Sequence, residues 1–68
     1  MLKISIKSAR VNAGYSQKKA SSMLGVSNKT LSSWENGNTV PKADMIDKIC
    51  QLYKVEYDNL IFLPNNPL

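Results

Sequence analysis

Glycine and proline divide this chain of 68 residues into short segments. The breaks fall at Gly14, Gly25, Gly37, Pro41 and Pro64, so the segments between the glycines have room for only two or three turns of helix. A chain of this length forms one domain, and it buries only roughly 60% of its unfolded surface. The core must therefore be small and built from neighbouring short elements.

The spacing of apolar residues is helical in most of these segments. It predicts an all-α fold, a compact bundle of five short helices over about residues 5–13, 16–24, 27–36, 42–53 and 57–62. Strand-like alternation occurs only near residues 2–6, where we expect an extended arm. Ser16 and Ser27 suit the N-caps of the second and third helices. The domain is expected to span residues 1–63, followed by a linker-like tail over residues 64–68.

The predicted core consists of apolar side chains that recur every three or four residues along one side of each helix. These side chains belong to Ile6, Ala9, Ala13, Ala20, Met23, Leu24, Leu31, Trp34, Met45, Ile46, Ile49, Cys50 and Tyr53. Trp34 could also stack on a base, but its position opposite the polar side of its helix favours packing in the core. Cys50 fits the same pattern as a small buried residue, with redox sensing as the alternative for its thiol.

The composition excludes several classes of site. One cysteine cannot form an internal disulfide, and the chain has no histidine. These counts exclude a zinc cluster and a Cys/His or Ser/His catalytic pair, and the five acidic residues are too scattered to suggest a metal site. We therefore expect no metal, no cofactor and no enzymatic activity. The apolar runs are shorter than the ~20 residues of a membrane span, and residues 1–7 are too mixed for a signal peptide.

The charge is distributed unevenly along the chain, whose net charge is +4. Residues 1–34 contain six basic and no acidic residues, whereas residues 35–68 contain three lysines and all five acids. A basic half beside a mildly acidic half suits a surface for a polyanion. Solvated charges that cluster by chance fit the same numbers, so the charge alone does not decide the function.

Residues 16–37 have the pattern of two short helices joined by a tight turn. Gly25 can adopt the positive φ that such a turn requires. Counting about 100° per residue along the second helix of the pair places four polar side chains on one arc, opposite Leu31 and Trp34. They are Asn28, Lys29, Ser32 and Ser33. Their donors and acceptors suit base edges in the major groove of DNA, although many solvated helix faces are also polar.

Over about residues 4–62 the chain resembles the phage-repressor and Cro-type helix-turn-helix family, also called the xenobiotic-response-element family. The resemblance rests on short motifs that occur in the family's order. They are Ile6 with Ala9-Arg10, Gly14-Tyr15-Ser16-Gln17, Leu24-Gly25-Val26-Ser27, Trp34-Glu35-Asn36-Gly37, Pro41, Ile49-Cys50, Tyr53, Val55 and Leu60. It implies a lambda-repressor-like DNA-binding fold in a bacterial or phage-encoded protein of the cytoplasm, associated with the nucleoid.

The resemblance also implies roles for individual residues. The four polar residues of the arc would face the bases, and Arg10 and Glu35 match a structural ion pair. Three positions depart from the family, which usually has Leu-Ala at Ala20-Ser21 and often Glu at Lys19. Lysine near a helix N-terminus is easier to explain if a phosphate lies beside it, although surface charge explains it equally well. The phosphate-contacting residues are then expected to be Gln17, Lys19, Ser27, Asn36, Asn38 and Lys42.

The expected partner is double-stranded DNA with a palindromic operator, bound by a weak homodimer, because a single helix reads only a few base pairs. The possible dimer interface is an apolar end formed by Tyr57, Leu60, Ile61, Phe62 and Leu63, which could instead fold over the first helix. We expect a transcription regulator of the phage or mobile-element repressor kind, with no small-molecule effector evident. The alternatives are an antitoxin that binds a toxin and regulates its own operon, and a protein-interaction module that has lost DNA binding.

Overall fold

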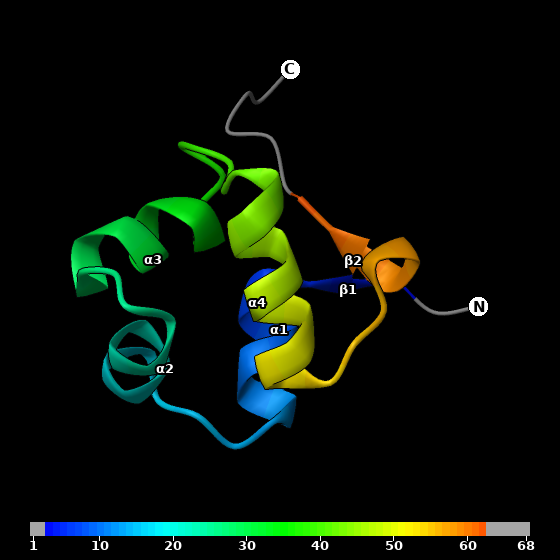
Figure 1. Ribbon diagram of the computed structural model, residues 1–68, viewed down its shortest axis with the longest axis horizontal. Coiled ribbons are helices and arrows are strands. Elements are labelled where there is room, and N and C mark those ends of the chain that lie inside the picture. The colour runs from blue at the N-terminus through cyan, green and yellow to red at the C-terminus, as the bar shows by residue number, and fades with distance from the viewer. Residues whose placement is uncertain (1–2, 63–68) are drawn as a thin grey trace.

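The computed structural model describes residues 3–62, which form four α-helices, one 3-10 helix and one pair of short strands. In chain order these are β1 (Ile4–Ser5), α1 (Ile6–Asn12), α2 (Gln17–Leu24), α3 (Asn28–Glu35), α4 (Ala43–Tyr53), η1 (Tyr57–Asn59) and β2 (Leu60–Ile61). In Figure 1, α2 and α3 lie on one side of α1 and α4, and the strand pair lies on the other. None of the helices within residues 3–62 is long and apolar enough to cross a membrane.

Serine hydroxyls fix where the first three helices begin. Ser5, Ser16 and Ser27 are the N-caps of α1, α2 and α3, and each side chain accepts a hydrogen bond from the backbone N–H three residues later. Such a cap satisfies one of the N–H groups that have no acceptor within the helix. The predicted caps Ser16 and Ser27 are therefore confirmed. Ser5, predicted as the first residue of a helix, instead precedes it.

Each α-helix is followed by a residue in the left-handed region. These residues are Gly14 at φ +87°, Gly25 at +77°, Gly37 at +80° and Lys54 at +58°. The next residue in each case donates its backbone N–H to the carbonyl five residues earlier, the bond that closes a Schellman motif. The positive φ reverses the chain within two residues, which explains how four helices fit into so short a sequence.

The prediction of a fifth helix over residues 57–62 is wrong. The segment forms the 3-10 turn η1 and then the short strand β2, so the mostly helical fold has four α-helices and a small strand pair, which is still consistent with the predicted all-α class. β2 pairs in parallel with β1, with Ile4 opposite Leu60 and Ser5 opposite Ile61. The predicted N-terminal arm offers unpaired backbone groups, and pairing with it satisfies the backbone of residues 60–61.

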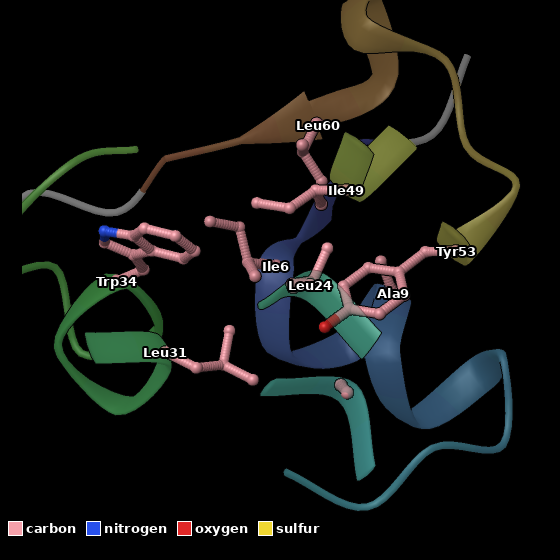
Figure 2. Close-up of a cluster of buried hydrophobic side chains, with 9 residues drawn as sticks. Ile6, Ala9, Leu24, Leu31, Trp34, Ile49, Tyr53 and Leu60 are labelled. Carbon is pink, nitrogen blue, oxygen red and sulfur yellow. The ribbon is translucent and has the colours of Figure 1, made fainter. Parts of the chain in front are cut away.

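The core lies where α1, α2, α3 and α4 meet, and β2 closes it from one side (Figure 2). Its buried apolar members are Ile6, Ala9, Ala20, Leu24, Leu31, Trp34, Ile49, Tyr53 and Leu60. Ile46 is buried as predicted, and Met45 and Cys50 are half-buried. Leu60 belongs to this core, so little of its side chain is left for the possible dimer interface.

Two other predicted core residues are exposed. Met23 is 52% exposed, and the buried positions of α2 are Ala20, Ser21 and Leu24. The small side chains of Ala20 and Ser21 face inward and let α2 approach its neighbours closely, which turns Met23 toward solvent. Ala13 is also exposed, because it lies at the C-cap where α1 ends rather than within the helix.

Candidate nucleic-acid interface

The turn between α2 and α3 fixes how α3 is presented. Gly25 ends α2 in the left-handed conformation, Val26 is half-buried against the core, and Ser27 caps the N-terminus of α3. Leu31 is completely buried and Trp34 nearly so, which anchors one side of α3 to the rest of the protein. The opposite side is therefore available to a partner.

The structure places the four predicted base-reading residues along this available side. Asn28 and Lys29 are exposed, and Ser32 and Ser33 are half-buried. The two serines already have partners within the protein. The Asn36 side-chain amide donates to Ser32 Oγ at 3.4 Å, and Ser33 Oγ lies 2.8 Å from Thr39 Oγ1 in the loop before α4.

A buried ion pair joins the end of α3 to α1. Arg10 Nε donates to Glu35 Oε2 at 2.7 Å, and both side chains are buried. The hydrogen bond to Glu35 raises the pKa of Arg10, although burial acts in the opposite direction. Arg10 also donates to the carbonyl of Tyr15 at 2.8 Å, so one guanidinium holds both α3 and the turn before α2.

Gln17, predicted to contact phosphate, makes a hydrogen bond within the protein through its side-chain amide. Its amide Nε2 donates to Glu35 Oε1 at 3.1 Å. Gln17 lies three and four residues before the buried Ala20 and Ser21, so helical spacing places it on the inward side of α2. Ser16 already caps the N–H of Lys19, and the positive end of α2 favours an anion near the other N–H groups of its first turn.

The remaining predicted phosphate contacts all lie on the surface. Lys19, Asn36, Asn38 and Lys42 are exposed. The hydroxyl of Ser27, which is also exposed, is already used within the protein, because it accepts from Thr30 N and donates to Thr30 Oγ1 at 2.9 Å. The hydroxyl proton is therefore already donated, and any contact of Ser27 with a phosphate oxygen would use its backbone N–H.

Tyr53 brings a polar group into the core beside the ion pair. Its hydroxyl is buried and has no hydrogen-bond partner within residues 3–62. Burial and the negative charge of Glu35 raise the pKa of Tyr53 to about 12, partly opposed by the charge of Arg10.

The described residues include no group of three or more cysteine, aspartate or glutamate side chains that could hold a metal ion.

The fold and the spacing of these residues agree with a comparison to protein families. A helix-turn-helix family model matches residues 6–60 of this chain, which include all four α-helices. The chain belongs to this helix-turn-helix family. The match confirms the resemblance to DNA-binding domains of the phage-repressor and Cro type.

Three curated relatives share the helix-turn-helix region. The HTH-type transcriptional regulator ImmR of Bacillus subtilis is 39% identical over 82% of this chain, which corresponds to 44% of ImmR. YgzD of the same species, named an uncharacterized HTH-type transcriptional regulator, is 31% identical over 91% of this chain and 94% of its own length. Antitoxin PezA of Streptococcus pneumoniae is 33% identical over 90% of this chain and 39% of PezA. The chain thus spans less than half of ImmR and PezA and nearly all of YgzD.

Three features of this helix-turn-helix site were missed from the sequence. They are the hydroxyl contact from Thr39, the inward bond of Gln17 and the unpartnered hydroxyl of Tyr53. The first had a signal, because a glycine that ends a helix turns the chain back over the last helical turn. The inward bond of Gln17 also had a signal, because Gln17 lies three residues before Ala20 and therefore on the same side of the helix. The third depends on side-chain packing across the core, which no local pattern reveals.

Proposed function

We propose that this DNA-binding protein is a repressor of transcription that recognises a specific site and reads the major groove with α3. The observation that carries the proposal is the available side of α3, which presents amide, ammonium and hydroxyl groups and no carboxylate. The one carboxylate of α3, Glu35, is buried and paired with Arg10. Such a side suits base edges, whereas solvated helix faces usually carry charges of both signs.

The four residues on that side would divide the reading between them. Asn28 has both a donor and an acceptor and can pair with N6 and N7 of adenine. Lys29 can donate to O6 or N7 of guanine, or to a phosphate. Ser32 and Ser33 are short and can accept or donate, so they suit several bases.

Phosphate contacts on both sides of α3 would hold it in the groove. On one side, Gln17 and Lys19 would bind the backbone at the N-terminus of α2, where the helix favours an anion. Ser27 would contact the strand near the start of α3. On the other side, Asn36, Asn38 and Lys42 would bind through the loop that leads into α4. These contacts position the protein and carry no base information.

Repression is the regulatory outcome that requires least of so small a domain. A protein that occupies a promoter tightly blocks it without any further activity, so binding alone is sufficient. The names of ImmR and YgzD as transcriptional regulators support a regulatory role. The phage-repressor and Cro-type family supports a phage or mobile-element origin.

Selection from a random double-stranded DNA library tests this function, with the parent chain, Asn28→Ala and Lys19→Ala compared in parallel. We expect the parent to select one motif. Asn28→Ala should relax the preference at one base pair at a cost of ~1–3 kcal/mol, and Lys19→Ala should weaken binding to all sequences alike. Variants that keep the motif and the affinity of the parent would show that these residues do not form the reading site.

We further propose that two copies bind a palindromic operator, because one recognition helix reads only a few base pairs. The apolar surface that suits a weak homodimer contains Tyr57, which is 60% exposed, and the half-buried Ile61 and Phe62. The rings of Tyr57 and Phe62 lie 6.4 Å apart between centroids. Leu63, the last residue of the predicted interface, lies outside the described residues.

Sedimentation of the protein alone and on a palindromic site tests the dimer. We expect a weak dimer in solution that DNA reinforces, and Tyr57→Asp should abolish it while leaving the fold intact, since Tyr57 lies on the surface. Lys54→Asp, a neighbouring exposed change, is the matched control and should leave the dimer unaffected. Only monomer in both samples would exclude this interface.

The similarity to antitoxin PezA favours one second function, an antitoxin that binds a toxin and represses its own operon. That function keeps the same DNA site and adds a protein partner. Expression together with the product of the neighbouring gene separates the two functions. A stable complex of the two products would support the antitoxin, whereas DNA binding without a partner supports the simple repressor.

A further inference from the structure

We propose that Thr39 is a positioning residue for base reading, because its hydroxyl holds the hydroxyl of Ser33 on α3. The inference rests on the proposed function and names a residue that it did not include. The observation that carries it is the distance of 2.8 Å between Ser33 Oγ and Thr39 Oγ1. Thr39 lies in the loop before α4, and the helical residues alone would not identify it as part of the reading site.

The backbone explains why residues six apart meet. Gly37 adopts φ +80° and donates its N–H to the carbonyl of Trp34 at 3.2 Å. Asn38 then donates its N–H to the carbonyl of Ser33 at 2.9 Å. These two bonds fold the loop back over the last turn of α3, so Thr39 arrives beside Ser33. Ser33 is therefore bound to the loop twice, through its carbonyl and through its hydroxyl.

The hydroxyl pair fixes the position from which Ser33 donates to a base or accepts from it. A serine hydroxyl has one donor and two acceptor sites, and either member of this pair can be the donor. When Ser33 donates to Thr39, its free lone pairs can accept from the amino group of adenine or cytosine. When Thr39 donates, the Ser33 proton is free for O6 or N7 of guanine or for O4 of thymine. In both cases the position of Ser33 Oγ is fixed by Thr39.

Removal of the Thr39 hydroxyl should free this side chain. Ser33 Oγ then rotates among its staggered positions, so it no longer meets one base edge from a fixed position. We expect Thr39→Val, which keeps the shape and removes the hydroxyl, to lower discrimination at one base position about two- to tenfold, the value of one ordinary hydrogen bond. The salt dependence of binding should stay unchanged, because neither residue is charged.

The test is selection of DNA sites by the full chain and four variants, namely Thr39→Val, Thr39→Ser, Ser33→Ala and the double variant Ser33→Ala with Thr39→Val. Thr39→Val and Ser33→Ala should change the preference at the same base position. Thr39→Ser keeps a hydroxyl and should restore the profile of the parent. The double variant should match Ser33→Ala, because Thr39 acts through Ser33. Thr39 is exposed, so the variants should fold as the parent does, which circular dichroism checks.

Several results would overturn the inference. Thr39→Val could keep the profile of the parent, weaken all sequences equally, or alter a base position that Ser33→Ala leaves unchanged. In each case Thr39 does not position Ser33, while selection of a motif by the parent still supports the proposed function. A parent chain that selects no motif at all would instead refute the proposed function, and this inference with it.

Discussion

Glu35 is the residue that connects three parts of the helix-turn-helix. It lies at the end of α3 and accepts hydrogen bonds from Arg10 of α1 and Gln17 of α2. A buried carboxylate is costly unless charged and neutral donors surround it, and here both kinds are present. The orientation of α3 relative to α2 therefore depends on one carboxylate as well as on apolar packing.

Tyr53, unlike Glu35, has a buried polar group without a partner: its hydroxyl makes no hydrogen bond within residues 3–62. Tyr53→Phe removes the hydroxyl and keeps the ring, so we expect the free energy of unfolding at pH 7 to rise by about 1 kcal/mol. Urea unfolding measures this change. An equal or lower stability of the variant would mean that the hydroxyl is satisfied in solution.

The pKa of Tyr53, raised to about 12, adds a pH dependence. The unfolded chain ionises its tyrosines near pH 10, whereas folded Tyr53 stays neutral until about pH 12. The stability that depends on neutral Tyr53 is therefore complete below pH 10 and is lost as the pH rises to about 12. The advantage of Tyr53→Phe over the parent should grow by about 1 kcal/mol between pH 7 and pH 11. Parallel pH profiles of the two proteins would contradict this assignment.

At the scale of the elements, the helix ends show how this chain stays compact. Three of the four α-helices are followed by glycine in the left-handed region, and α4 is followed by Lys54 at φ +58°. A residue with a Cβ atom is strained in that region by roughly 1–2 kcal/mol. The Schellman bond from Val55 to the carbonyl of Cys50 holds Lys54 there.

Lys54→Gly should therefore stabilise the protein. We expect the free energy of unfolding to increase by about 1 kcal/mol, somewhat less than the strain because glycine is more flexible in the unfolded chain. Lys54→Ala is the control, since it removes the charge and keeps the strain, and it should change stability by less than about 0.5 kcal/mol. Equal effects of the two substitutions would assign the change to the lysine side chain instead of the backbone.

These elements also show what could be predicted from the sequence. Helix starts and stops follow local rules, so Ser16, Ser27 and the glycines located α2 and α3 correctly. The failures depend on contacts that are distant in sequence. Residues 60–61 are extended because residues 4–5 pair with them, and Met23 is exposed because Ser21 takes the inward position.

For the site, the polar arc of α3 follows from helical counting. The hydrogen bonds of Ser33 and Gln17 depend instead on where a loop and a neighbouring helix lie, which the local sequence does not show.

At the scale of the whole molecule, the acidic side chains are unevenly distributed: exposed lysines lie on α2 and α3, and the exposed acids of residues 3–62 lie on α4 and the segment after it. Lys19 and Lys29 are exposed on these two helices, and Lys42 is exposed just before α4. The exposed acids within residues 3–62 all belong to residues 44–58, in α4 and the segment after it. Under the proposed function, such a distribution of charge favours the approach of DNA to the side of the molecule that carries α2 and α3.

The number of phosphates bound should appear in the salt dependence of DNA binding. The logarithm of affinity falls with the logarithm of salt concentration by about 0.9 per phosphate neutralised. We expect Lys19→Gln to reduce the steepness of this line by about that amount. Lys3→Gln is the matched control, because Lys3 donates to the carbonyl of Asp58 on the side of the strand pair, away from α3 (Figure 1). If the two variants have equal slopes, Lys19 does not contact a phosphate.

The pairing of β1 with β2 has a consequence for the order of folding. The Schellman motifs and serine caps join residues only a few positions apart, so α1 to α4 can form early. The pairing of strand residues 4–5 with residues 60–61 must instead close a loop that contains almost the entire described chain. Loop closure of this length costs more conformational entropy than any local contact. We therefore infer that the strand pair forms last and opens first, and that its amide protons exchange with solvent before those that hold α3 in place.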